Sequence, residues 1–172
     1  IILNELTFKE GDKVDSSDLK FNRERVYSLG IFNHVNLNVQ RENKKNILVI
    51  NVEESWYIYP IPFIGIKDRD WNKVNYGINF RVRNLRGRNE TVRLILSFGY
   101  DPEYFLLYSN PYLIKEQNIS FDFSANYSTL TNKSDKAELI YGGEFDQKFI
   151  SASISFGKRF NLFNKLFLSL GY

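Results

Sequence analysis

The chain has 172 residues, a formal net charge of +3 at pH 7 and a pI near 9.0. This length allows one or two domains with a sizeable core. No run of Lys or Arg exceeds two residues, so a nucleic-acid-binding stripe is poorly supported. The absence of Cys excludes a disulfide framework and thiolate chemistry, and a single His makes a zinc site improbable.

The composition suits a β-rich chain. No run of about 18 apolar residues is present, so the sequence predicts no transmembrane helix. Aromatic residues make up 16%, which fits the interfacial girdles of a membrane barrel or the core of a large β-sandwich. The chain begins without Met or a signal peptide and ends in a strand-like pattern. We therefore expect a fragment of a longer chain, cut at both ends.

Residues 1–54 form a unit unlike the rest. Apolar residues at helical spacing predict a short first helix, and a second helix follows with caps at 15–17. Gly30 closes that helix as a left-handed residue. Strands at 35–40 and 47–53 then form a hairpin. The expected unit is a small α+β domain that lacks its first strand.

From residue 55 onward the helical pattern disappears. Most of the expected strands have about 9 to 11 residues, the length that crosses a bilayer at a tilt: 57–67, 73–83, 90–100, 103–112, 118–127, 149–157 and 165–172. The segment 137–145 is either a further membrane strand or an arm of a long external loop. The expected count is therefore seven or eight antiparallel strands, joined mostly by short connections.

The clearest alternation lies in residues 75–112. One side of each strand is apolar and rich in Tyr and Phe, and the other carries Arg, Asn, Gly and Ser. This pattern is typical of a transmembrane β-barrel with a wet lumen. A soluble sheet with one face on a core predicts the same alternation, and would bury Phe80, Leu94 and Phe123 between two layers.

The charged strand residues fit the lumen side of this sheet. They are Arg81, Arg83, Arg93 and Asp122, with Asp122 as a candidate partner of the arginines. Facing lipid at the midplane would cost about 2–4 kcal/mol for each arginine. We therefore expect all four side chains to point into the lumen.

Four motifs stand at the junctions of these elements. Leu29-Gly30-Ile31-Phe32 joins the second expected helix to the next strand, and Asn84-Leu85-Arg86-Gly87 lies at a turn. Tyr108-Ser109-Asn110-Pro111-Tyr112 ends an expected strand, and FGKRFNLFNKLFLSLGY, at 156–172, covers a later turn and strand. Together they resemble the BamA-type outer-membrane assembly superfamily: the first is similar to a helix–strand junction of its POTRA domains, and the others are similar to turns and strands of its barrel. The resemblance covers nearly the whole chain.

The resemblance implies a periplasmic POTRA domain followed by the first half of a roughly sixteen-stranded outer-membrane β-barrel. The implied function is folding and insertion of unfolded outer-membrane proteins, with outer-membrane lipid and accessory assembly lipoproteins as further partners. The POTRA edge would pair with extended substrate through one strand of its hairpin. The residues concerned are Val35, Asn36, Leu37, Asn38 and Val39. No cofactor is implied.

The stretch 56–68 carries a candidate lateral seam. Pro60 and Pro62 are two apart in an expected strand, so both missing N–H groups face the same neighbour. We hypothesise that they face the closing side of the barrel, where a weak seam could accept an incoming strand. The alternative is that they lie outside the bilayer and only guide the chain. The seam comprises Tyr57, Ile58, Tyr59, Pro60, Ile61, Pro62, Phe63 and Ile64.

Catalytic chemistry has little support in the sequence. His34 is expected at the surface, and the neighbouring Glu53 and Glu54 point to opposite strand faces. No enzyme activity is expected. The alternatives to an insertase are a two-partner-type polypeptide secretion pore, a passive porin or anchor barrel, and a soluble β-rich binding module.

Overall fold

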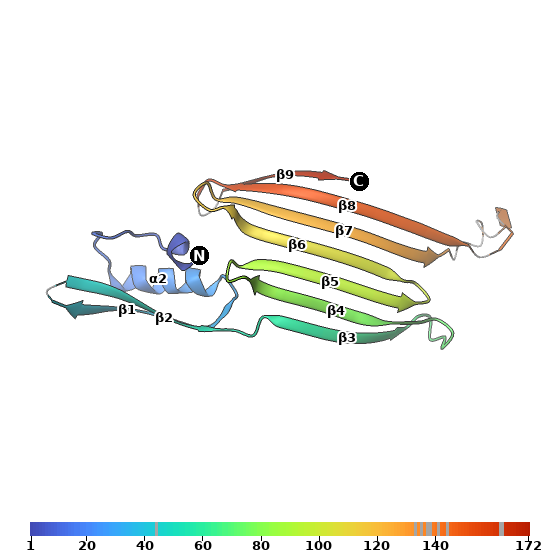
Figure 1. The fold of residues 1–172 in the computed structure, drawn as a ribbon, viewed down its shortest axis with the longest axis horizontal. Coiled ribbons are helices and arrows are strands. Elements are labelled where there is room, and N and C mark those ends of the chain that lie inside the picture. Colours follow the sequence, from blue (N-terminus) through green and yellow to red (C-terminus); the bar gives the residue numbers. More distant parts are fainter. Residues whose placement is uncertain are drawn as a thin grey trace. The chain divides into compact units, whose positions relative to one another are not determined.

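The computed structural model describes residues 1–43, 45–132, 134, 136, 139–140, 142–143, 145–161 and 164–172. The chain divides into two compact units, Ile1–Tyr57 and Ile58–Tyr172. The first is the expected α+β unit, and the second is a single β-sheet (Figure 1). Among the described residues, no helix has the length and apolar character needed to span a membrane.

The first unit follows the expected order of two helices and a hairpin. Asp15 caps the second helix, because the Asp18 N–H donates to the Asp15 carboxylate at 2.8 Å and the Asp15 N–H donates to Asp18 at 3.1 Å. Gly30 follows the helix with a φ of +67°, as its role in the C-terminal cap predicts. The elements are α1 (Ile2–Glu5), α2 (Ser16–Tyr27), β1 (Phe32–Glu42) and β2 (Lys45–Glu54).

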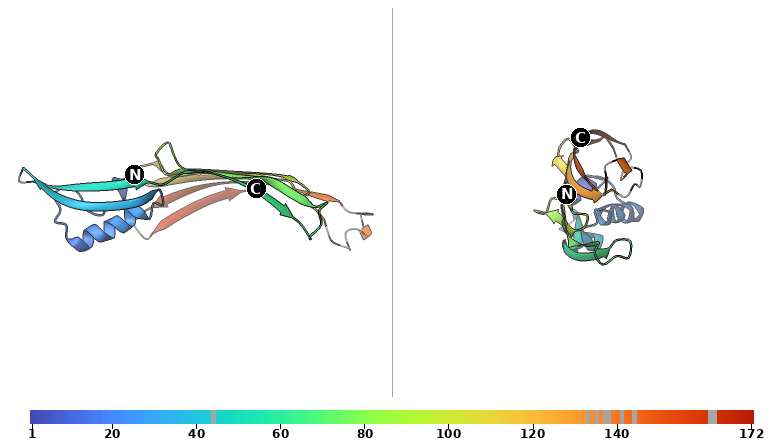
Figure 2. Two further views of the ribbon diagram at one scale, coloured as in Figure 1. Left: turned by 90° about the horizontal axis from the view of Figure 1, so that it is seen from below. Right: turned by 90° about the vertical axis from the view of Figure 1, so that its right-hand side faces the viewer.

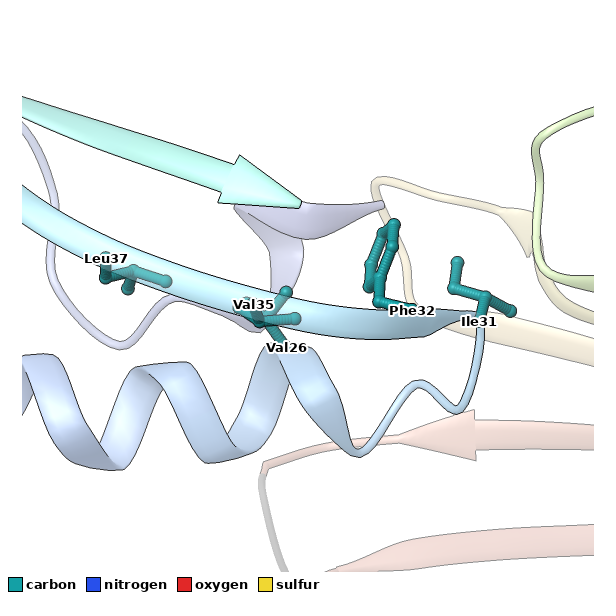
Figure 3. Close-up of a cluster of buried hydrophobic side chains, with 5 residues drawn as sticks. All are labelled: Val26, Ile31, Phe32, Val35 and Leu37. Atoms are coloured by element: carbon teal, nitrogen blue, oxygen red, sulfur yellow. The ribbon is translucent and has the colours of Figure 1, made fainter. Parts of the chain in front are cut away.

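The core of the first unit lies between α2 and the hairpin. Val26 of α2 is fully buried, and it packs with Val35 and Leu37, which share one face of β1 (Figure 3). Ile31 and Phe32 complete the buried cluster. Because β1 and β2 pair in register, the apolar face of β2 extends the same core.

The second unit is a meander of seven strands in chain order, each antiparallel to the next. Its turns alternate between the two ends of the sheet (Figure 1). The strands are β3 (Ile58–Ile66), β4 (Val74–Leu85), β5 (Glu90–Gly99), β6 (Glu103–Ile114), β7 (Ile119–Thr131), β8 (Asp146–Arg159) and β9 (Lys165–Gly171).

The segment 137–145 lies in part outside the described residues. β7 and β8, which flank it in sequence, pair directly with each other as far as Thr131 and Asp146. The described part of the sheet therefore contains seven strands. β7 and β8 are longer than expected, because their pairing continues beyond the bilayer-length segments that the alternation marked.

The seven strands form one curved layer (Figure 2). Every fully buried apolar side chain of the described residues belongs to the first unit. Phe80, Leu94 and Phe123 are only half-buried, by their neighbours in the sheet. In its described residues, the second unit therefore shows no second layer of the kind that a soluble sandwich would require.

Candidate functional site

The register divides the second unit into an apolar and a polar face. One row across the sheet consists of Ile78, Leu96, Tyr104, Tyr127 and Ile150, which pair in succession. Side chains that pair directly project from the same face. The apolar side chains of β4, β5, β7 and β8 therefore meet on one side of the sheet, where no other part of the described unit covers them.

Aromatic side chains gather at two levels of this apolar face. At the level of the β3–β4 and β5–β6 turns, successive ring centroids lie 5.7–6.1 Å apart across four strands: Tyr76, Phe98, Tyr104 and Tyr127. At the opposite level, successive centroids lie 6.3 and 5.2 Å apart in a second row: Tyr108, Phe121 and Phe156. We call these the upper and lower aromatic rows.

The opposite face carries the predicted lumen residues. It also carries more apolar side chains than a purely polar lumen face would have. Arg81 and Arg93 pair directly on this face. Arg93 donates to Asn79 Oδ1 at 3.2 Å, and its guanidinium lies 5.9 Å from the ring centroid of Phe105. These contacts hold one arginine beside another in spite of their like charge.

Asp122 and Arg83 occupy different surroundings from this arginine pair. Asp122 pairs with Ser109 and Ser155, and no ion pair joins it to an arginine within the described ranges. Arg83 is exposed and lies where the β4–β5 register shifts. The proposed role of Asp122 as an arginine partner stays a prediction.

β3 departs from the alternation, because both of its faces are apolar. Ile61 and Phe63 lie on the otherwise polar side, paired with Asn79 and Gly77. A Cβ on Gly77 would lie 2.9 Å from the Phe63 ring. The aromatic ring thus occupies space that the glycine leaves open.

The backbone of β3 directs its prolines away from β4. The Lys67 N–H donates to the Lys73 carbonyl at 2.9 Å, which continues the hydrogen bonding of the β3–β4 ladder one residue beyond its last pair, Ile66 with Val74. Hydrogen-bonded pairs recur every second residue in an antiparallel ladder. The odd-numbered residues of β3 therefore bond to β4, whereas positions 60 and 62 face the opposite edge.

That opposite edge is an end of the sheet. Within the described residues β3 pairs with β4 alone. Ile61 and Ile64 expose 54% and 73% of their surface. The edge combines main-chain acceptors with two positions that lack a donor, so it can pair with another strand only incompletely.

The predicted POTRA edge also lies at an edge of its sheet. In the described residues β1 pairs only with β2. Val35 and Leu37 point into the core, whereas Asn36 and Asn38 are exposed. Packing of Val35 and Leu37 in the core therefore fixes the position of β1, and the polar side chains of the strand face outward.

Sequence reasoning missed a buried carboxylate in the β4–β5 turn. Glu90 is fully buried, and its oxygens accept from Arg86 Nε and Nη2 at 2.8–3.0 Å and from Asn110 Nδ2 at 3.3 Å. Hydrogen bonding to Glu90 raises the pKa of the Arg86 guanidinium above its usual value. Arg86 Nη2 also lies 3.5 Å from the Tyr108 hydroxyl. The cluster stands beside the lower aromatic row.

A second unpredicted cluster joins three connections at the other end of the sheet. The buried Asp101 accepts from Lys67 and, at 3.2 Å, from the Thr131 N–H. Its own N–H donates to Asn75 Oδ1 at 2.9 Å. The end of β3 is thereby tied to the β5–β6 turn and to β7.

Metal chemistry has no support in the described part of the chain, which contains no group of three or more His, Cys, Asp or Glu residues that could hold an ion. The one histidine, His34, is exposed on β1. The two units therefore offer strand edges and surfaces as candidate sites.

The chain is similar to a known protein family and to solved structures. Residues 1–55 match the POTRA family, described as a surface antigen variable number repeat. The fold is similar to the crystal structure of BamA from Haemophilus ducreyi lacking POTRA domains 1–3, with a TM-score of 0.68 and 17% sequence identity. This similarity covers 99% of the present chain and 31% of that one, so the chain spans about a third of its length. No curated protein matches the sequence.

Proposed function

We propose that this chain belongs to the BamA-type surface antigen superfamily and acts in the assembly of β-barrel proteins at the bacterial outer membrane. The POTRA match and the BamA fold support the superfamily and the outer membrane. The finer proposal is that unfolded barrel proteins bind the POTRA domain and then pair with the edge of β3. Accessory lipoproteins belong to this proposal as partners.

The uncovered apolar face supports contact with lipid. An apolar sheet face needs a covering layer, and a bilayer supplies one. The two aromatic rows lie at two levels of this face, as expected of side chains near the two membrane–water interfaces. The polar face would line a hydrated lumen, with Arg81 and Arg93 on it.

The observation that carries the proposal is the direction of the proline pair. Pro60 and Pro62 face away from β4, so the outer edge of β3 has two fewer N–H donors for pairing with another strand. A strand edge that forms only some of the ladder hydrogen bonds is suited to a seam that can close, open and accept a new strand. In lipid, unmade backbone hydrogen bonds favour exchange of one partner strand for another.

The proposed activity uses no cofactor and no covalent chemistry. The driving force is the folding of the substrate, whose strands gain hydrogen bonds and bury apolar surface in lipid. The POTRA edge would contribute by holding extended substrate through the main chain of Val35–Val39, independent of side-chain sequence.

Disulfide trapping in the full-length protein tests strand pairing at β3. Ile61 is the position of choice, because odd positions of β3 form non-hydrogen-bonded pairs with an incoming strand, where Cα atoms lie about 4.5 Å apart. The present sequence contains no native Cys to interfere. We expect Ile61→Cys to cross-link to single-Cys outer-membrane substrates during their folding into proteoliposomes.

Ile95→Cys is the matched control for this experiment. Ile95 lies in the same row and on the same face as Ile61, but on a central strand whose two edges are already paired. Equal cross-linking at both positions, or none at Ile61 while substrates still fold, would contradict pairing at β3. Loss of one secreted protein after depletion of the protein in cells, with barrel proteins retained, would favour a secretion pore instead.

A further inference from the structure

The charges of the second unit are distributed unequally between the two ends of the sheet. The segments at the end where β3 begins, 83–90, 111–118, 157–161 and 164–166, hold seven basic residues against Glu90 and Glu116: Arg83, Arg86, Arg88, Lys115, Lys158, Arg159 and Lys165. The described residues of the segments at the other end, 66–74, 99–103 and 130–148, include five basic and five acidic residues. We call the first group of segments the basic rim.

The basic rim adjoins the lower aromatic row. Lys158 pairs with Ile119 and Leu166, so the register places it on the apolar face, one pleat beyond the paired rings of Phe121 and Phe156. Arg86 reaches the same level at Tyr108. Lys158 and Arg86 therefore lie at the two ends of the lower aromatic row, at the border of the apolar face.

The geometry of Arg86 leaves part of its guanidinium for another acceptor. The Glu90 carboxylate accepts hydrogen bonds from Nε and Nη2 of Arg86, and the arginine side chain remains 60% exposed. Because Glu90 is fully buried, it fixes the guanidinium plane without competing for its outer donors. A phosphate oxygen is the acceptor that an exposed guanidinium edge matches best.

We propose that the basic rim binds the headgroups of anionic phospholipids in the leaflet at the level of the lower aromatic row. This inference rests on the proposed contact of the apolar face with lipid. Cations beside an aromatic row meet phosphodiester groups at the depth where acyl chains meet water. The near-neutral opposite end would show no such preference.

Native mass spectrometry of the full-length protein in detergent micelles, titrated with phosphatidylglycerol or phosphatidylethanolamine, tests this site. The test variant carries Arg88→Gln, Lys115→Gln and Lys158→Gln, which form no ion pair within the described ranges. Each basic residue near an anionic surface contributes about a fivefold change in affinity, so the triple variant should bind phosphatidylglycerol about 100-fold more weakly at low salt. Binding of phosphatidylethanolamine should change little.

The matched control removes three charges from the opposite end through Arg69→Gln, Lys136→Gln and Lys148→Gln, all at exposed positions. It should keep the preference of the wild type. Equal losses in the two variants, an unchanged preference in the test variant, or displacement of the lipid by millimolar inorganic phosphate would each overturn the proposal. The last outcome would indicate a site for free phosphate.

Two further measurements keep the proposal falsifiable if the triple variant misfolds. Raising NaCl from 50 to 500 mM should reduce the preference of the wild-type protein for phosphatidylglycerol, because salt screens exposed charges. Lys115→Gln alone should lower it about fivefold. Cross-linking of Ile61→Cys in membranes of phosphatidylethanolamine alone reads out strand pairing, so failure of the lipid site is distinguishable from failure of the proposed function.

Discussion

Restoring the two missing donors of β3 should strengthen its outer seam. In Pro60→Ala/Pro62→Ala, both new N–H groups point away from β4, toward the outer edge where we propose that another strand pairs in the full-length protein. A hydrogen bond contributes about 0.5–1.5 kcal/mol net, so the pair should stabilise the seam by about 1–3 kcal/mol. This corresponds to an opening equilibrium about 5- to 150-fold less favourable.

Hydrogen exchange measured by mass spectrometry in micelles would detect this change. The reporter is the amide of Ile64, which shares the outward direction of the prolines. Its exchange should slow in the double variant by the same factor, and folding of substrates should slow with it. Pro111→Ala is the control, since Pro111 lies where the β6–β7 register shifts. Unchanged or faster exchange at Ile64, with β4 still protected, would show that no strand uses the restored donors.

Three other substitutions test the structure itself. Asn22→Ala should cost about 1–3 kcal/mol and speed exchange of the Thr7 amide, because the buried Asn22 Oδ1 accepts from that N–H at 2.7 Å. Gly77→Ala should lower the thermal unfolding midpoint by at least the equivalent of about 3 kcal/mol, since its Cβ would lie 2.0 Å from a backbone oxygen, whereas Gly65→Ala meets open space and should be nearly neutral. Glu90→Gln should lower the free energy of unfolding by about 1 kcal/mol, the difference between charged and neutral hydrogen bonds. Urea titration measures this as a lower midpoint, and an unchanged midpoint would refute a stabilising role for the charge of Glu90.

The strands and their faces were largely predictable from local sequence. In β4, β5, β7 and β8, alternation assigned each side chain to a face because that assignment follows from covalent geometry alone. The edge to which Pro60 and Pro62 point also follows from local rules, since a residue without an N–H cannot donate to a paired neighbour. The helix end at Gly30 was predictable for a similar reason, namely its positive φ.

The clusters at the two ends of the sheet were not predictable in this way. The contact between Glu90 and Asn110 joins residues 20 apart, and it depends on a turn in which the non-glycine residues Asn84 and Arg86 have positive φ angles. The contact between Lys67 and Asp101 depends on where two turns end after the strands have paired. Such contacts are set by the register of whole strands, which local patterns do not determine.

The uneven location of the buried core has a consequence for how the chain holds its shape. The first unit carries its own buried apolar cluster, so its cohesion is a property of the polypeptide and responds to urea in the ordinary way. The described part of the second unit has no buried apolar cluster of its own. The stability of the sheet therefore depends on the lipid or detergent that covers its apolar face. Changing the amphiphile should therefore move the unfolding of the sheet and leave that of the small unit in place. The unfolding of the small unit would thus depend on the aqueous solvent, and the unfolding of the sheet on the amphiphile.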